Sequence, residues 1–293
     1  MSSYALFLGC LIPCHLQYME VAARKALEKL DVELVDMPDA GCCPEPVGIQ
    51  ALDQRTWLAL AARNLCIAES LDLDILTLCS GCYETLKAAN MTLRENPGLK
   101  EDVNGILSHV RREFKGKIEV KHVVEVLYED VGLDRISETI QEPLNDLRVA
   151  VHYGCHLLRP SNIIRFDDPE RPTSLDELVE ATGARSTPYV GKMLCCGVGV
   201  KGVEAETSFG IARSKLLSVG RAGADCMVVV CPFCMTQYDL SQPLIQRAYG
   251  ETYDIPVLYY PELLCLAMGV NPEDLGLGFH RVSVDRVLDR IRG

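Results

Sequence analysis

The stretch DILTLCSGC (residues 74–82) joins an apolar run to a Cys-x-x-Cys, and the same arrangement recurs as CMVVVCPFC (residues 226–234). Each apolar run has the length of a buried strand and is followed at once by its first cysteine. A strand that ends on a cysteine, found twice in one chain, predicts an internal duplication organised around sulfur chemistry.

The repeat includes ten of the fourteen cysteines. Upstream of each Cys-x-x-Cys stands an adjacent cysteine pair, and upstream of that pair a Gly-Cys closes another apolar run. The gaps are 31 and 35 residues in the first copy and 39 and 34 residues in the second. This spacing is hard to obtain twice by chance. It groups the cysteines as Cys10, Cys42, Cys43, Cys79 and Cys82, followed by Cys155, Cys195, Cys196, Cys231 and Cys234.

The likeness of the two copies extends beyond cysteine. ARNL (62–65) matches RSKL (213–216) within a helical pattern. VKHVVEVLYEDVGL (120–133) aligns without gaps with VLYYPELLCLAMGV (257–270). The duplication therefore covers most of the chain.

We predict an α/β protein of two homologous Rossmann-like domains, residues 1–145 and residues 146–293, related by a pseudo-twofold axis. Short apolar runs alternate with amphipathic segments such as 123–130 and 235–250, which is the pattern of parallel-type sheets flanked by helices. Sites in such sheets form beyond the carboxyl ends of the strands. The predicted strands are 4–9, 32–37, 74–79 and 117–122, then 148–154, 225–231 and 255–260.

Composition narrows the possible functions. The chain has 293 residues and a net charge of −12, which disfavours non-specific binding to nucleic acid or to an anionic membrane surface. We find no apolar run of ~18 residues that would span a membrane. The N-terminal stretch lacks a basic segment, so we interpret it as a buried strand in a cytoplasmic protein. In a reducing compartment, fourteen cysteines indicate metal or redox chemistry rather than disulfides.

Five thiols per copy exceed what a structural zinc ion or an ordinary iron–sulfur cluster needs. Adjacent cysteines suit two different irons better than one ion. A thioredoxin-like Cys-x-x-Cys and a structural zinc remain alternatives, although neither explains the cysteine pairs. Cys66, Cys226 and Cys265 fall on apolar faces and are expected to be small buried hydrophobes. Cys14 is either a spare thiol near the first copy or a packing residue.

The repeated pattern resembles the cysteine-rich CCG domains, and in particular the B subunit of heterodisulfide reductase from methanogenic archaea, with FLGC and YGCH leading the two motifs. The resemblance implies two non-cubane [4Fe–4S] clusters, each bound by the five cysteines of one copy, so that all ten serve as metal and cofactor ligands. The first cysteine pair is followed by Pro44 where the family pattern has glycine, which removes no ligand.

The resemblance also implies an oxidoreductase, the catalytic subunit that reduces the coenzyme M–coenzyme B mixed disulfide to two thiols. One electron would come from each cluster, and Cys43 and Cys196 would be essential. Histidine commonly shuttles protons near neutral pH, so His156 and His15 are candidate donors, while His152 is as readily a packed strand residue. The substrate anions require cations, for which Lys201 and Arg159 are candidates and Arg165 and Lys192 secondary ones.

The chain shows no flavin or nucleotide fingerprint and no ferredoxin-type cysteine spacing. The resemblance therefore implies two partner subunits, a ferredoxin-like C subunit and a flavin-containing A subunit, linked to a hydrogenase or a formate dehydrogenase. The alternative is an iron–sulfur electron-transfer subunit of a quinone-linked lactate, glycolate or glycerol-phosphate dehydrogenase. A zinc-stabilised interaction scaffold is a third possibility.

Overall fold

A computed structural model describes residues 2–46 and 48–292, and it contains two four-stranded sheets in which every strand pairing is parallel. The first sheet has the strand order β2-β1-β3-β4, and the second has the order β6-β5-β7-β8. The predicted α/β class is confirmed. The strands are β1 (Ser2–Phe7), β2 (Val32–Asp36), β3 (Ile75–Thr77), β4 (Val120–His122), β5 (Arg148–His152), β6 (Arg185–Ser186), β7 (Cys226–Val229) and β8 (Val257–Tyr259).

The two sheets repeat each other in register as well as in order. Phe7 at the end of β1 lies opposite Thr77 of β3, and His152 at the end of β5 lies opposite Val229 of β7. In both sheets the central strands carry the cysteines just beyond their carboxyl ends. The predicted convergence of cysteines on one edge of each sheet follows directly from this register.

Helices flank both sheets. In α2 the buried side chains recur every three or four residues, so one face of this amphipathic helix packs on the core. The helices of the first half are α1 (Leu11–His15), α2 (Gln17–Lys29), α3 (Ile49–Leu52), α4 (Gln54–Leu71), α5 (Ser80–Glu95), α6 (Pro97–Ser108), α7 (Val123–Glu125) and α8 (Leu133–Glu138). Those of the second half are α9 (Ser161–Ile164), α10 (Ser174–Glu180), α11 (Ala205–Arg221), α12 (Pro232–Met235), α13 (Gln242–Tyr249), α14 (Tyr260–Ala267) and α15 (Asp285–Arg292).

Two predicted helices are not continuous. The segment predicted at 235–250 is divided into the end of α12, a π-helical turn (Thr236–Leu240) and α13, which begins afresh with Pro243 in its first turn. Proline at that position starts a helix easily but cannot continue one, since it lacks an N–H and clashes with the preceding turn. The segment predicted at 123–130 likewise passes from α7 into a π-helical turn (Val126–Val131).

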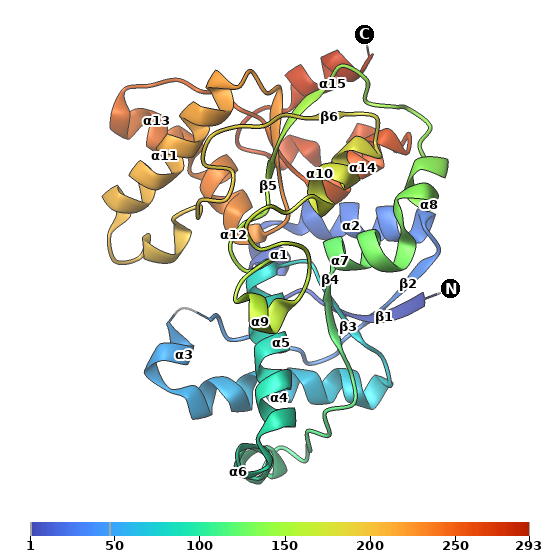
Figure 1. Ribbon diagram of the computed structural model, residues 1–293, viewed down its shortest axis with the longest axis vertical. Coiled ribbons are helices and arrows are strands. Elements are labelled where there is room, and N and C mark those ends of the chain that lie inside the picture. Colours follow the sequence, from blue (N-terminus) through green and yellow to red (C-terminus); the bar gives the residue numbers. More distant parts are fainter. Residues whose placement is uncertain (1, 47, 293) are drawn as a thin grey trace.

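The two halves are joined by reciprocal hydrogen bonds between equivalent positions. Tyr259 Oη donates to the carbonyl of Leu78 at 3.0 Å, and His122 Nε2 donates to the carbonyl of Val230 at 3.1 Å. His122 aligns with Tyr259 and Leu78 with Val230, so one contact is the image of the other, as a pseudo-twofold axis requires. Figure 1 shows α1, α5 and α12 meeting at this junction, with α2 and α14 packed beside it.

None of the described helices is both long enough and apolar enough to cross a bilayer. The predicted N-terminal strand is confirmed as β1, whose residues Tyr4 to Phe7 are buried.

Candidate functional site

The ten patterned cysteines form two groups in which neighbouring thiols touch. We call them the first and second cysteine groups. Contacts run through the first group in the order Cys10, Cys42, Cys43, Cys82, Cys79. The second group repeats that order as Cys155, Cys195, Cys196, Cys234, Cys231. The duplicated spacing of the sequence therefore becomes a duplicated arrangement of sulfur atoms.

The two groups meet. The thiol of Cys79 contacts the thiol of Cys231 across the junction of the halves, so the ten sulfurs form one continuous row. Both residues directly precede a helix, since Cys79 is the N-cap of α5 and Cys231 the N-cap of α12. A helix N-terminus favours negative charge, which suits a thiolate at either position.

The thiols within a group cannot all ionise together. Contacts with Cys42 and Cys82 lower the pKa of Cys43 to about 4, while contact with Cys43 raises the pKa of Cys42 above its usual range. In the second group, contacts with Cys155 and Cys196 lower the pKa of Cys195 to about 2, and contact with Cys195 raises the pKa of Cys196 to about 12. Full deprotonation of five adjacent thiols requires cations between them.

Glycine precedes the first cysteine of each group for a steric reason. Gly9 has φ +69° and Gly154 has φ +77°, a backbone conformation that glycine adopts without strain. A Cβ atom at Gly9 would lie 2.8 Å from Cys82 Sγ, and one at Gly154 would lie 3.6 Å from Cys234 Sγ. At Gly9 the missing side chain makes room for the sulfur of Cys82, whereas at Gly154 the positive φ is the feature that requires glycine.

A cavity of about 120 Å³ opens onto the second group and is closed by the first half of the chain. All five cysteines of the second group line it, together with His156 and the aromatic ring of Phe233. The first half contributes the loop at Glu45 and Pro46 and the start of α5 at Ser80 and Gly81. A small molecule held there would touch both halves.

Two buried donors near the second group lack a hydrogen-bond partner within the described part of the chain. His152 Nε2 and Tyr238 Oη are inaccessible to solvent and unpaired among the described residues. Their rings meet edge to face at 5.0 Å, and both groups lie near the charge of Cys195. Unpaired buried donors are rare and call for an acceptor. Sulfide and thiolate sulfurs of an iron–sulfur cluster are such acceptors, so the site fits this group.

An acid and a histidine from opposite halves face each other near the cavity. His156 Nδ1 lies 3.9 Å from Glu84 Oε2, and Glu84 is buried near the start of α5. Burial, assisted by the charge of Cys43, raises the pKa of Glu84 to about 7. Of the two histidines predicted as proton donors, His156 therefore lies in the cavity wall. His15 is exposed on α1 and is not among the residues that line the cavity.

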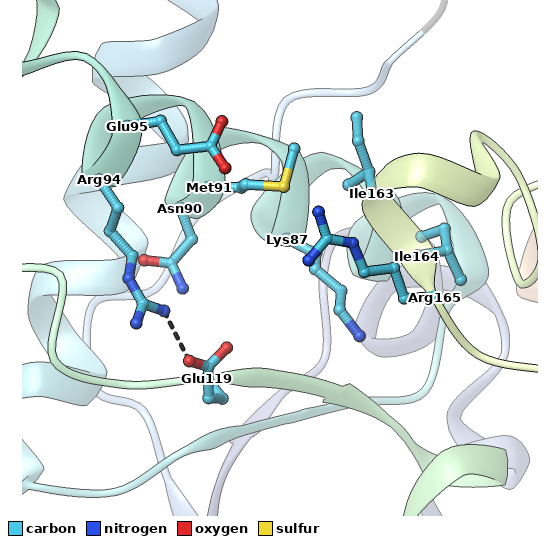
Figure 2. Close-up of a pocket in the computed structure, with 9 residues that line it drawn as sticks. All are labelled: Lys87, Asn90, Met91, Arg94, Glu95, Glu119, Ile163, Ile164 and Arg165. Atoms are coloured by element: carbon cyan, nitrogen blue, oxygen red, sulfur yellow. Dashed lines mark hydrogen bonds and ion pairs between the residues drawn. The ribbon is translucent and has the colours of Figure 1, made fainter.

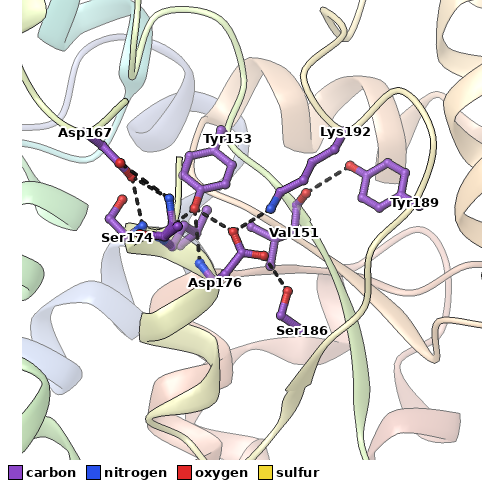
Figure 3. A network of polar contacts seen from close by, with 10 residues as sticks. Val151, Tyr153, Asp167, Ser174, Asp176, Ser186, Tyr189 and Lys192 are labelled. Carbon is purple, nitrogen blue, oxygen red and sulfur yellow. Dashed lines mark hydrogen bonds and ion pairs between the residues drawn. The ribbon is translucent and has the colours of Figure 1, made fainter. Parts of the chain in front are cut away.

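A polar network fixes the segments that carry Cys155 and Cys195 (Figure 3). Tyr153 Oη donates to Asp176 Oδ2 at 2.7 Å, and Lys192 Nζ donates to the same oxygen at 2.5 Å. Tyr153 stands two residues before one cysteine and Lys192 three residues before the other. Because Asp176 holds both, the strand end and the cysteine-pair loop are fixed relative to each other.

The structure places the predicted cations outside the cavity. Lys201 donates to Ser241 Oγ at 2.7 Å, Arg159 donates to the carbonyl of Pro169 at 2.7 Å, and Lys192 is held by Asp176. Arg165 lines a different hollow of about 470 Å³ between α5 and α9, where Figure 2 shows it beside Lys87, and no cysteine is among the residues that line this hollow.

The remaining cysteines lie outside the two groups. Cys66, Cys226 and Cys265 are buried, as predicted, and Cys14 is exposed on α1. Over residues 2–46 and 48–292, no three His, Cys, Asp or Glu side chains converge as ligands of a single ion.

Comparison with known proteins assigns both halves of the chain to one domain family. The CCG cysteine-rich domain family matches residues 4–87 and 149–239. The chain is 43% identical to the B subunit of ferredoxin:CoB-CoM heterodisulfide reductase of Methanosarcina mazei, over 99% of this chain and 97% of that protein. It is 44% identical to the B subunit of ferredoxin/F(420)H(2)-dependent CoB-CoM heterodisulfide reductase of Methanosarcina acetivorans, over 94% and 93% of the two chains.

The chain is also similar to one more distant relative and to one solved structure. The 8-methylmenaquinol:fumarate reductase membrane anchor subunit of Wolinella succinogenes is 29% identical over 97% of this chain and 98% of that protein. A crystal structure of a hypothetical protein from Helicobacter pylori matches 97% of this chain with a TM-score of 0.76 at 18% identity. This chain spans 52% of that one, and the match concerns the fold alone.

Proposed function

The chain belongs to the CCG cysteine-rich domain family and, within it, to the B subunits of heterodisulfide reductase, and from this premise we propose that it is the catalytic subunit that reduces the coenzyme M–coenzyme B mixed disulfide. The observation that carries the proposal is the contact between Cys79 and Cys231, which joins the two cysteine groups beside a cavity bounded by both halves. A disulfide placed there would contact the second group directly, and the first group would be reached through the neighbouring contact of Cys231 with Cys79.

We assign the two cysteine groups as ligands of two iron–sulfur clusters of the non-cubane [4Fe–4S] type. The five contacting thiols of each group, the glycine at the Gly-Cys step and the unpaired donors of His152 and Tyr238 support this assignment. When bound, the clusters would supply one electron each and iron that accepts thiolate ligands.

The reaction consumes two electrons and two protons, breaks one S–S bond and yields two thiols. The electrons must come from a reduced iron–sulfur partner of the ferredoxin class. We assign His156 as the proton donor nearest the cavity, with Glu84 at 3.9 Å able to replenish it through water. His15 and the cations Lys201 and Arg159 stay secondary candidates for proton delivery and for substrate contact. Of these side chains, only His156 lines the cavity.

The similar proteins are named as B subunits, which implies a multi-subunit assembly. We propose that this chain works in the cytoplasm and receives electrons from a ferredoxin-like C subunit. A flavin-containing A subunit connected to a hydrogenase or a formate dehydrogenase would supply electrons to that partner in turn.

Anaerobic purification followed by iron, sulfide and zinc analysis, and by assay with reduced viologen and the mixed disulfide, tests the proposal. We expect iron and sulfide to be present and the disulfide to be consumed. Cys196→Ala should abolish turnover, whereas the matched control Cys226→Ala, a buried cysteine in the neighbouring strand β7, should preserve it. Zinc without iron, or full turnover by Cys196→Ala, would contradict the proposal.

The similarity to a fumarate reductase subunit favours a second candidate. In that case the chain is an iron–sulfur electron-transfer subunit of a quinone-linked dehydrogenase. It would then contain iron and exchange electrons with a quinone-linked partner, but it would leave the mixed disulfide untouched in the viologen assay.

A further inference from the structure

We propose that the second cysteine group holds the more oxidising of the two clusters and so takes the first electron at equilibrium, because Lys215, His152 and Tyr238 bring to it one positive charge and two hydrogen-bond donors that have no counterpart at the matching positions of the first group. The inference rests on the proposed function, since it presumes a cluster in each group. It concerns the reduction potentials of the two clusters, which would be equal if the two copies of the repeat were identical.

Lys215 brings a buried positive charge to the second group. Its side chain is 2% exposed, and Nζ lies 3.0 Å from the carbonyl of Lys192, 2.6 Å from the carbonyl of Leu194 and 2.9 Å from His152 Nδ1. These three acceptors match the three N–H donors of an ammonium group. Burial lowers the pKa of Lys215 to about 8, against the opposing charge of Cys234, Cys196 and their neighbours, so the ammonium form still predominates at neutral pH.

His152 provides the first of the two hydrogen-bond donors near the sulfurs. An ammonium has no lone pair, so His152 Nδ1 must accept from Lys215 and the ring proton resides on Nε2. Burial, reinforced by Lys215, holds the pKa of His152 well below its usual range, which keeps the ring neutral. Nε2 and Cys234 Sγ both lie beside the Cβ position of Gly154, at 4.0 Å and 3.6 Å. The unpaired N–H therefore lies beside the second group.

Tyr238 supplies the other donor. It follows Cys234 by one helical turn and is wholly buried, with a hydroxyl that has no partner among the described side chains. Burial, followed by the charge of Cys196 and Cys234, holds the pKa of Tyr238 well above its usual range, so its proton stays in place. The hydroxyl is therefore available to donate toward those sulfurs.

The first group has none of these features at the matching positions. The aligned residues are Asn64 for Lys215, Phe7 for His152 and Leu86 for Tyr238. Asn64 is equally buried, but it is neutral, and its amide is bonded to Gly41 N and to the carbonyl of Cys42, both at 3.0 Å. Both residues therefore anchor the loop that leads to a cysteine pair, and only Lys215 adds charge.

Electrostatics gives the direction of the difference. Reduction adds a negative charge to a cluster, and a cation a few ångströms away stabilises that charge strongly in a low-dielectric interior. Hydrogen bonds to cluster sulfurs act the same way, and both are established determinants of cluster potential. The charge, the imidazole and the hydroxyl all favour reduction at the second group.

Redox titration of the anaerobic protein, followed by electron paramagnetic resonance, tests the inference. We expect two midpoint potentials and a shift of the more positive one to lower potential in Lys215→Met. The shift should be at least tenfold in the ratio of reduced to oxidised cluster, which is 59 mV for one electron. Lys215→Arg, which keeps the positive charge, should retain most of the wild-type potential. Tyr238→Phe, which removes one oxygen atom, should shift the same potential by less.

Tyr260→Phe is the matched control, because it removes a buried hydroxyl of the second half that donates to the carbonyl of Leu178, away from the cysteines. It should move neither potential. If Lys215→Met does not retain iron, Tyr238→Phe and His152→Phe still test whether these side chains raise the potential of the second group. Unchanged potentials in iron-loaded variants would overturn the inference and leave the proposed function intact, whereas absence of iron from the wild-type protein would overturn the proposed function itself.

Discussion

The phenol of Tyr259 donates a hydrogen bond to the carbonyl of Leu78, 3.0 Å away in the opposite half of the chain and directly before Cys79. Its image is the bond from His122 to the carbonyl of Val230, directly before Cys231. Each half therefore uses the end of its outer strand to hold the cysteine-bearing strand of the other. These two bonds position the one thiol contact that links the cysteine groups.

Removing the phenol should loosen this junction. In Tyr259→Phe the carbonyl of Leu78 loses its partner in a buried place, which costs about 1–3 kcal/mol. The midpoint of thermal unfolding of the iron-loaded protein should fall by several degrees. Tyr128→Phe is the comparison, because Tyr128 also bonds across the halves, to Glu177, but at a partly exposed position where water can substitute. An equal loss in both variants would refute the role given to Tyr259.

His122 should make the protein sensitive to mild acid. Burial lowers the pKa of His122 to about 4, from 6.5 in the unfolded chain, and both ring nitrogens are engaged, since Nδ1 accepts from Val124 N and Nε2 donates to Val230. Between pH 6.5 and pH 4 the His122 imidazole is therefore protonated in the unfolded state but not in the folded state. The free energy of unfolding consequently falls as the pH falls. The loss is on the order of 3 kcal/mol.

The measurement is the unfolding midpoint across this pH range in the wild type and in His122→Gln. The variant is less stable at pH 7, but its curve should be flatter between pH 6.5 and pH 4. Parallel curves would show that another group governs the acid sensitivity.

Gly9 provides a test of the cysteine geometry that spares every cysteine. Alanine at Gly9 places a methyl group 2.8 Å from Cys82 Sγ, so the first cysteine group should assemble poorly and about half of the iron should be lost. Gly250→Ala is the matched control, since Gly250 also has a positive φ, +64°, in the left-handed helical region, with nothing within 4 Å of the added atom. It should cost only ~1–2 kcal/mol of backbone strain and retain the iron. Equal iron in both proteins would contradict the prediction.

His156 should affect turnover without affecting metal content. His156→Gln keeps the size of the side chain but cannot donate a proton as an acid, and general acid catalysis contributes about 10²–10⁴-fold. We expect a loss in that range in the viologen-linked assay, with normal iron. His109→Gln, at the exposed end of α6, should be unaffected. A His156→Gln enzyme as fast as the wild type would assign the proton to another group.

The sequence was informative where the chemistry repeats. The Cys-x-x-Cys after an apolar run predicted both the strands β3 and β7 and the meeting of distant cysteines at one sheet edge, because parallel strands present their carboxyl ends together. The two residues of β6 and the break before α13 were not predicted. The stability of β6 depends on neighbours such as Asp176 rather than on any local pattern, whereas the break before α13 has a local cause in Pro243.

Side chains with a single polar group were harder to place. Lys215 aligns with Asn64 inside an amphipathic helix, and a lone lysine in such a pattern is normally solvent-exposed. Only the fold shows that it points inward at two carbonyls and a histidine. Conversely, Lys201 and Arg159 stand near cysteines in sequence, yet Ser241 and Pro169 engage them elsewhere.

The packing of α14 of the second half against α2 of the first has a practical consequence. Cys265 Sγ donates to the carbonyl of Ala22 at 3.3 Å within this contact, and both residues are wholly buried. If the two halves were separated, the apolar surfaces of α2 and α14 would be exposed to water. The same happens to an obligate dimer when its protomers dissociate. A half produced alone should therefore be inactive, and a split-gene version should be active only when both halves are present together.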